Sequence, residues 1–306
     1  MLAPVVAGVD GSAESLSAAE WAAREAVRRA CPLHLMHAWT WHPRHGQEEP
    51  ASAARRHLAL RLLRQAEERC RDTCPDLRLS AEQVEGPATL ALVKAAERAD
   101  LLVLGSRGLS GFTGFLVGSV ALGVVARSTR PVVLVRAGEE AEDEHFPADD
   151  APFETRPSAS MRTGYRDVVL GVDVRDPCDE VIEFACEAAR LRHARLSAVH
   201  AWQPVSPIGL GPGEIGLVSG PEQADEWLGF VSAVLQPWRD KYPDVEIVAS
   251  VVNDKASNAL VRAASSASLL VVGRHLTERP AISRTGPVAH AAIHHVGCPV
   301  AVVPHG

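Results

Sequence analysis

Two hydrophobic periods alternate along the chain. Short, almost wholly apolar runs such as 4–9 are typical of strands covered on both faces, whereas segments such as 13–30 carry apolar residues at helical spacing. In the first half this pattern predicts strands at 4–9, 33–38, 78–84, 101–104 and 131–135, and helices at 13–30, 52–70, 88–98 and 118–128. The alternation favours a doubly wound α/β fold, in which helices cover both faces of a parallel sheet.

Several short sequence motifs occur twice in the chain, in the same order. VVAGVD at 5–10 and HAW at 37–39 return, with at most one change, 163 residues later. LLVLG at 101–105 and PVVLV at 131–135 return in closely similar form 168 residues later, so the second copy has extra residues, which we assign to the Gly- and Pro-rich segment 203–221. These offsets indicate an internal duplication. We therefore predict two tandem domains, each with a five-stranded parallel sheet.

Helix starts in the two copies carry different signals. Ser12 is suited to cap the first helix, because its hydroxyl can accept a hydrogen bond from a first-turn N–H. In the second copy, Asp176 is placed to cap the corresponding helix and Pro177 suits its first turn.

An acidic segment separates the two copies. From Glu139 to Glu154 there are eight acidic residues and no Lys or Arg, and Pro147 and Pro152 fall in the same stretch. A like-charged, proline-bearing segment is typical of a solvated linker. We predict domains at 1–138 and 165–306, with the linker at 139–164.

Composition narrows the function classes. The net charge of the 306 residues is −7 and no basic stripe is apparent, so nucleic acid is not an expected partner. No apolar run approaches the ~20 residues that span a bilayer, so we expect no membrane insertion and a cytoplasmic location. The six cysteines form no CxxC pair and are expected to be reduced thiols. Histidines that are close in sequence are candidate metal ligands, namely His42, His45, His290, His294 and His295. None of them has a carboxylate or cysteine partner at a recognised spacing, so no metal site is predicted.

The segment LGSRGLSGFTGFLVGSV, at 104–120, holds five glycines between a predicted strand and a predicted helix. A flexible linker there would leave buried backbone groups unpaired. A turn with positive φ would explain one or two glycines. The remaining option is a cradle for an anion, because glycines admit a phosphate to the backbone N–H groups at the start of the following helix. Gly105, Gly108 and Gly118 would form this cradle, and Gly111 and Gly114 would shape the loop. Donors in this segment are the hydroxyls of Ser106, Ser110 and Ser119 and the guanidinium of Arg107.

The spacing of this segment is Gly105-x2-Gly108-x9-Gly118-Ser119, which is neither a Walker A loop nor a dinucleotide fingerprint. It resembles the ATP-binding signature of the universal stress protein family. VVAGVDGS at the start, LHLMHAW in the second strand and TRPVVLVR in the fifth resemble the same family. The likeness covers both halves, as in tandem members of the actinobacterial type, and it implies an adenine nucleotide alpha hydrolase-like fold.

This resemblance implies an ATP site in the first domain, with Mg²⁺ as a counterion of the nucleotide. Asp10 would bind the nucleoside, Gly8 would let the ligand approach the backbone, and Met36 to Ala38 would edge the adenine. Ribose and phosphates would be held by Gly105, Gly108, Gly118 and Ser119, with Ser106, Arg107, Leu109, Ser110 and Gly111 along the loop. From the residues alone, Asp10 also suits a helix cap, Met36 a core position and His37 a packed position.

The second copy departs from the signature. It keeps Gly171, Asp173, Gly273 and Gly286 at the equivalent positions, but the middle glycine is replaced by Leu276 and the final Ser by Pro287. Proline lacks the N–H that a phosphate would accept from. Losing two or three charged hydrogen bonds, at ~1.5–3 kcal/mol each, would weaken binding strongly. We therefore expect ATP in the first domain and weak or no binding in the second, where Arg274, Arg279 and Arg284 leave a different anion open.

Three function classes follow. The leading one is a regulatory ATP-binding protein involved in the stress response, since neither a general base nor an acidic Mg²⁺-binding pair is evident for fast hydrolysis. The second is an enzyme, either an adenylating enzyme, an ATP pyrophosphatase or a slow ATPase, although GVDGSAES resembles the required SGGxDS loop only loosely. The third is an interaction scaffold with a vestigial site. In the family the last strand often pairs two domains, so 131–135 and 299–303 are expected to pair as an intramolecular pseudo-dimer, or to support a homodimer; the protein partner is not specified.

Overall fold

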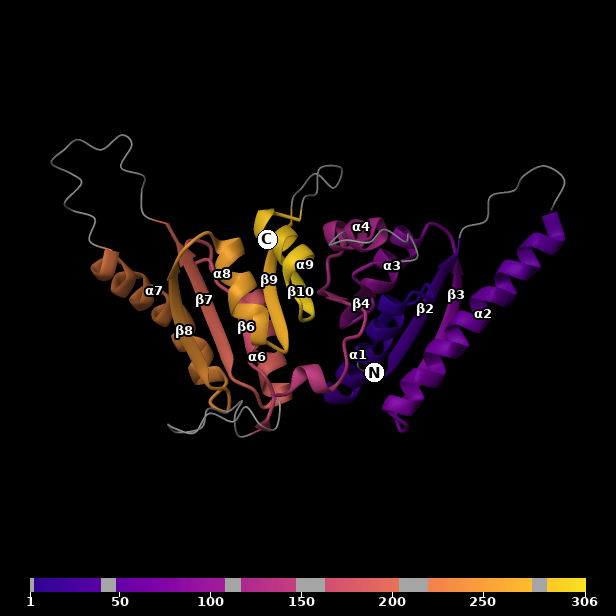
Figure 1. Ribbon diagram of the computed structural model, residues 1–306, viewed down its shortest axis with the longest axis horizontal. Helices are drawn as coiled ribbons and strands as arrows, with labels where there is room; N and C mark the ends of the chain where they lie inside the picture. The colour runs from indigo at the N-terminus through magenta and orange to yellow at the C-terminus, as the bar shows by residue number, and fades with distance from the viewer. Residues whose placement is uncertain (1–2, 40–47, 108–116, 147–162, 204–219, 277–284) are drawn as a thin grey trace.

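The computed structural model describes residues 3–39, 48–107, 117–146, 163–203, 220–276 and 285–306 (Figure 1). The first half comprises β1 (Val5–Gly8), α1 (Ala13–Arg28), β2 (Leu33–Trp39), α2 (Glu48–Thr73), β3 (Leu79–Glu85), α3 (Ala88–Ala96), β4 (Leu101–Gly105), α4 (Ser119–Arg127) and β5 (Val132–Val135). These bounds agree with the predicted elements to within two residues, except that α2 extends further at both ends.

The second half repeats this order after a short 3-10 helix, η1 (Glu142–Glu144). Its elements are β6 (Val168–Gly171), α6 (Asp179–Arg192), β7 (Leu196–Trp202), α7 (Gly220–Lys241), β8 (Ile247–Asn253), α8 (Ala256–Ala263), η3 (Ala264–Ser266), β9 (Leu269–His275), α9 (Pro287–His295) and β10 (Val300–His305).

The strands form one ten-stranded sheet in the order β3-β2-β1-β4-β5-β10-β9-β6-β7-β8. All pairs within each half are parallel, which confirms the predicted pair of doubly wound five-stranded domains. At the centre, β5 and β10 are antiparallel, with Val133 opposite Ala301. The predicted pairing of the last strands within one chain is therefore present.

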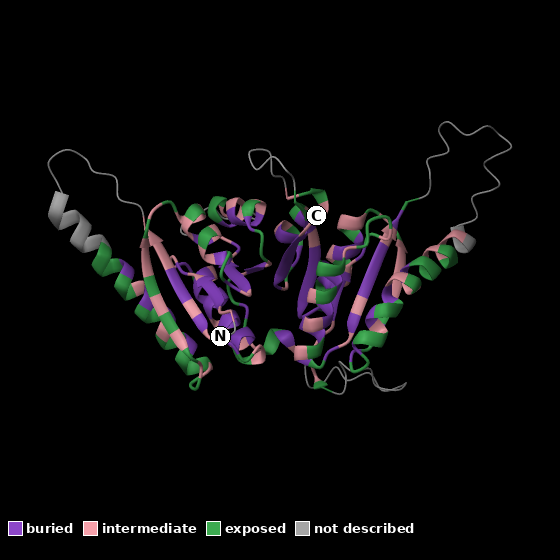
Figure 2. Cartoon of the chain, turned by 180° about the vertical axis from the view of Figure 1, so that it is seen from behind, coloured by how far each residue is buried: buried purple, intermediate pink, exposed green. Residues whose placement is uncertain are grey.

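Helices cover both faces of this sheet, so its inner strands are mostly buried, whereas the edge strands β3 and β8 are mostly intermediate or exposed (Figures 1 and 2). One core cluster lies under α1, α2, α6 and α7 and includes Trp21 and Leu235; the other lies under α3, α4, α8 and α9 and includes Leu92 and Ile293. Each cluster contains residues of both halves, so the two domains share their hydrophobic core across the β5–β10 pairing.

A buried charge cluster joins α1 to α6. The Arg192 guanidinium is fully buried and donates to the Glu25 carboxylate at 2.8 Å. Burial alone would raise the pKa of Glu25, but the guanidinium groups of Arg192, Arg29 and Arg28 together hold it well below its usual range. Arg192 also lies over the Trp21 ring, and Arg29, its counterpart in the first copy, lies over the Phe184 ring, the counterpart of Trp21. Such reciprocal contacts are the mark of a two-fold interface.

The acidic segment is not wholly solvated, contrary to prediction. Glu144 is fully buried and bridges Arg24 and Arg28, and Glu139 is also buried. Cations on α1 compensate Glu144, which a count of charges within the segment does not reveal. Residues 147–162 of the predicted linker lie outside the described residues.

The helix caps differ between the copies. Ser12 is the N-cap of α1 and accepts from the Ser15 N–H, as predicted. The prediction for the second copy is wrong: α6 begins at Asp179 with Cys178 as its N-cap, because Asp176 and Pro177 remain in the loop after β6. In the part of the chain that the structure describes, no helix combines the length and apolarity needed to cross a membrane.

Candidate functional site

A cavity of about 230 Å³ opens at the carboxyl ends of β1, β2 and β4, beside the start of α4. Ligand sites of doubly wound sheets lie at this edge. The cavity brings together eight of the residues predicted from the sequence, namely Gly8, Asp10, Met36, Ala38, Gly105, Arg107, Gly118 and Ser119. Of the other predicted residues, Gly108, Leu109, Ser110 and Gly111 lie outside the described residues.

Asp10 stands at the cavity wall in a fixed orientation. Its Oδ1 accepts from both the backbone N–H and the hydroxyl of Ser12. The carboxylate therefore closes the turn before α1 and lines the cavity at once, so the structural and binding roles considered for it are compatible. Asp173 repeats this turn in the second domain by accepting from the Arg175 N–H at 3.0 Å.

Two predicted glycines have a packing reason to be glycine. A Cβ at Gly8 would lie 2.6 Å from a methyl carbon of Leu104, and a Cβ at Gly105 would lie 2.8 Å from the backbone of Glu14 and of Ser15. Gly8 thus makes room for core side chains, and Gly105 lets β4 approach α1. This packing reason stands beside the expected role of Gly8, which also lines the cavity, in letting a ligand approach the backbone.

Among the described residues, no side chain caps the start of α4, which faces the cavity. Gly118 is the N-cap, and the first turn of the helix contains no acidic residue. The cavity is lined here by Gly118, Ser119, Val120 and Ala121. Uncapped N–H groups and the positive end of the helix dipole favour an anion at this position.

Ser106 and Arg107, two neighbouring predicted site residues, differ in their relation to the cavity. Ser106 is buried and does not line the cavity; its carbonyl accepts from the Gly118 N–H at 2.9 Å and so ties together the two ends of the glycine segment. Arg107 does line the cavity, and its Nε lies 3.5 Å from the Glu14 carboxylate.

Sequence reasoning missed the apolar half of the wall, including Leu92 and Leu104, as well as Ser15. The repeat held a usable signal, because Leu92 returns as Leu260, which lines the cavity of the second domain. His37, for which the sequence suggested a packed position, has its Nδ1 donating to the Val9 carbonyl at 2.7 Å. His200 donates in the same way to the Val172 carbonyl.

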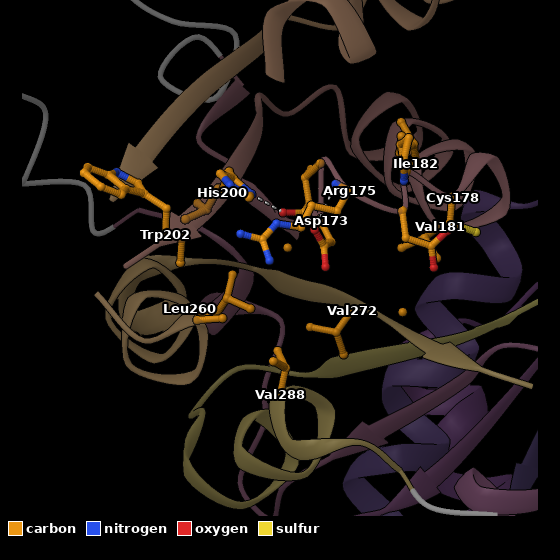
Figure 3. Close-up of a pocket in the computed structure, with 18 of the residues that line it drawn as sticks. Asp173, Arg175, Cys178, Val181, Ile182, His200, Trp202, Leu260, Val272 and Val288 are labelled. Carbon is orange, nitrogen blue, oxygen red and sulfur yellow. Dashed lines mark hydrogen bonds between the residues drawn. The ribbon is translucent and has the colours of Figure 1, made fainter. Parts of the chain in front are cut away.

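The second domain has a larger cavity, of about 590 Å³, at the equivalent place (Figure 3). Its wall includes the predicted residues Gly171, Asp173 and Gly273. Figure 3 shows Trp202 and His200 on one side, Leu260, Val272 and Val288 below, and Val181 and Ile182 opposite. Gly286, the remaining predicted residue, is the N-cap of α9 and has a φ of 76°.

The anion-binding end is changed in this domain. Pro287 occupies the first position of α9, so one N–H of the helix start is missing. Leu276 donates its N–H to the His305 carbonyl, which extends the sheet where the first domain leaves it after Gly105. Arg274, suggested as a cation for another anion, is buried and donates to the Ser128 carbonyl of the first domain. Arg279 and Arg284 lie outside the described residues.

All six cysteines are free thiols. Burial raises the pKa of the Cys70, Cys186 and Cys298 thiols to about 12. These residues act as small apolar side chains and not as reactive thiolates.

The fold and the two cavities define a tandem α/β protein with one cavity per domain at the carboxyl edge of a shared sheet. A family model described as the universal stress protein family matches residues 1–136 and 164–304, so this chain belongs to that family. Universal stress protein Rv2005c of Mycobacterium tuberculosis is 29% identical over 317 residues, covering 97% of this chain and 96% of its own. Universal stress protein Rv1996 of the same organism is 27% identical over 316 residues, covering 97% and 94%. A universal stress protein structure from Archaeoglobus fulgidus shares the fold across 99% of this chain and 98% of its own, with a TM-score of 0.66 at 14% identity.

Proposed function

We propose that the first domain binds ATP as a regulatory ligand and that the second domain binds it weakly or not at all. The observation that carries this proposal is the uncapped N-terminus of α4, which meets a cavity that also contains Asp10. One end of the cavity suits a nucleoside, with an apolar wall and a carboxylate. The other end suits a phosphate chain, with backbone N–H groups and the cation Arg107.

The size of the cavity indicates how the nucleotide lies. Ligand pockets of drug-sized molecules measure about 300–1,000 Å³, whereas this cavity measures about 230 Å³. The enclosed space therefore suits the nucleoside part, with the phosphates extending along the start of α4 and towards the glycine segment. Mg²⁺ would accompany the phosphates as a counterion.

A regulatory role fits the residues of this wall better than a catalytic one. Asp10 is the only carboxylate among the described residues that line the cavity, and its Oδ1 is held by Ser12. Hydrolysis at a useful rate needs a positioned base or water-orienting group near the γ-phosphate. ATP would instead shift an equilibrium between two conformations or two assembly states. The size of that shift is set by the difference in ATP affinity between the two states.

Direct binding measurements test the proposal. Equilibrium titration of the nucleotide-free full chain is expected to give one ATP per chain. Gly118→Asp places a carboxylate where phosphate is proposed, and at an N-cap Asp supports the helix, so the fold is retained while affinity falls by at least about tenfold. Gly118→Asn adds nearly the same volume without the charge, so the difference between the two variants reports the electrostatic part.

Several outcomes would contradict the proposal. Equal ATP affinity in the wild type and Gly118→Asp would contradict the proposed phosphate cradle at the start of α4. Two equivalent ATP molecules per chain would contradict the proposed difference between the two domains. Identification of the nucleotide released by denaturing the purified protein separates the function classes. Release of AMP and pyrophosphate would favour the enzyme hypothesis, and no nucleotide together with no binding would favour a scaffold.

A further inference from the structure

Three metal-ligating side chains meet at the rim of the second cavity. Asp176 comes from the loop after β6, His275 from the end of β9 and His305 from the end of β10. One ligand atom from each lies within 4.8 Å of the others, and Asp176 and His305 also line the cavity. Asp176 precedes His275 by 99 residues, and His275 precedes His305 by 30 residues. Only the folded sheet brings the three side chains together.

The sheet holds the two histidines side by side. β9 and β10 are parallel and His275 is the direct register partner of His305, so both side chains project from the same face. In the first domain β4 ends at Gly105 and β5 at Val135, two residues short of the matching positions. Those positions are occupied by Arg107 and Ala137, so the extended ladder and its histidine pair belong to the second domain alone.

The geometry of the cluster suits coordination. His275 Nδ1 donates to the Leu276 carbonyl at 3.1 Å, which leaves the Nε2 lone pair directed away from the backbone and 3.8 Å from Asp176 Oδ2. Metal-binding histidines commonly use their second nitrogen in this way. The ring centres of His275 and His305 are 5.1 Å apart. Two imidazoles bound to a tetrahedral zinc ion at ~2.1 Å hold their ring centres roughly 5 Å apart.

The His305 ring packs beside a glycine of the neighbouring strand β9. Gly273 makes room for the ring, because a Cβ there would lie 2.8 Å from His305 Nε2. A dication bound here would be coordinated by both imidazoles and attracted to the Asp176 carboxylate.

We propose that Asp176, His275 and His305 form a binding site for a divalent transition metal ion of the zinc type. Two imidazoles and one carboxylate suit Zn²⁺ and its neighbours, whereas Mg²⁺ and Ca²⁺ prefer sites made of oxygen atoms. Three protein ligands leave a fourth position open, as in catalytic zinc sites. Because two of the three ligands line the 590 Å³ cavity, a ligand in that cavity can reach the open position.

Zinc titration of the full, untagged chain tests this site after chelation and removal of bound metal. We expect one Zn²⁺ per chain by calorimetry, retained when Mg²⁺ is present in large excess. Loss of groups that merely orient a ligand lowers metal affinity by about 10–100-fold, so loss of a ligand in His275→Ala or Asp176→Asn is expected to lower it at least tenfold. Both side chains are mostly exposed, so these variants are expected to fold. Co²⁺ bound by the wild type is expected to show the visible absorption of a tetrahedral site.

The matched control is His290→Ala. The ring centroids of His290 and His294 lie 4.3 Å apart on α9, with the rings tilted by 33°, so these residues form another imidazole pair among the described residues, separate from the cluster of three. Zinc binding that survives His290→Ala and is lost in His275→Ala supports the proposal. Zinc binding unchanged in both His275→Ala and Asp176→Asn, or abolished by His290→Ala alone, overturns it. Gly118→Asp is expected to leave zinc binding unaltered. The zinc test is therefore independent of whether the ATP proposal holds.

Discussion

The two cavities share one end and differ at the other. Both have an aspartate turn after the first strand, at Asp10 and Asp173, and a histidine, His37 or His200, that donates to the carbonyl of the residue directly after that strand. At the far end, the first domain presents an open helix N-terminus, and the second presents Pro287 and a longer pair of strands. The repeated fold accounts for the shared end, whereas the two helix starts and the strand lengths account for the difference.

The largest expected effect concerns Arg29 and Arg192, which are equivalent in sequence but unequally buried. Arg192 is 0% exposed and pairs with a buried Glu25, while Arg29 is 13% exposed and also pairs with Asp100, which is 45% exposed. Removing one partner of a buried pair costs about 3–5 kcal/mol. Arg192→Ala is therefore expected to lower the free energy of unfolding by that amount, and Arg29→Ala by clearly less, as measured by urea unfolding. Equal losses would show that the interface is symmetric in energy despite its unequal burial.

The buried linker residue Glu139 predicts a pH dependence of stability. Burial raises its pKa to about 7, with Asp143 and Glu144 adding to the effect, against 4.5 without the fold. Between these values the folded state holds the proton more tightly than the unfolded state, so stability falls as pH rises from 4.5 to 7.

Glu139→Gln is expected to remove this loss. At pH 8 the variant should be more stable than the wild type by roughly 3 kcal/mol, with the difference shrinking towards pH 4.5. Urea midpoints measured across this range check the prediction. A difference between the two proteins that does not change with pH would contradict it.

The paired glycines Gly105 and Gly273 are expected to respond unequally to alanine. A Cβ at Gly105 meets the backbone of α1, whereas at Gly273 the nearest contact is the His305 ring. Overpacking against rigid groups costs about 1–3 kcal/mol, so Gly105→Ala should be the more destabilising change in thermal unfolding. Gly273→Ala should instead displace His305 and weaken zinc binding. Equal losses of stability in the two variants, together with unchanged zinc binding in Gly273→Ala, would contradict the predicted difference between the two glycines.

The helix caps give the smallest expected effect. Ser12 accepts a hydrogen bond from the first turn of α1, while Cys178 makes no such bond at the start of α6. Ser12→Ala is expected to cost about 1 kcal/mol, and Cys178→Ala close to none. Chemical unfolding of the two variants side by side measures the difference, and equal values would show that the cap contributes nothing to stability.

Much of the architecture could be predicted because it depends on local periodicity. The apolar runs located the strands, and the offsets of 163 and 168 residues located the second copy. Spacing also identified much of the first cavity wall, since Asp10, Gly105 and Gly118 follow strands or precede a helix. The burial of Glu144 was missed because its partners Arg24 and Arg28 lie on a distant helix. The cluster of Asp176, His275 and His305 was missed for the same reason, since strand register creates it.

The antiparallel pairing of β5 with β10 has a consequence for stoichiometry. Both strands belong to one chain, so the unlike domains meet at a high effective concentration, on the order of millimolar for short tethers, however dilute the protein is. A mixture of separate domains would also sample pairs with two identical halves. The tethered chain selects the mixed pair, so each molecule that binds the proposed nucleotide also carries one proposed metal site, in a fixed ratio of one to one.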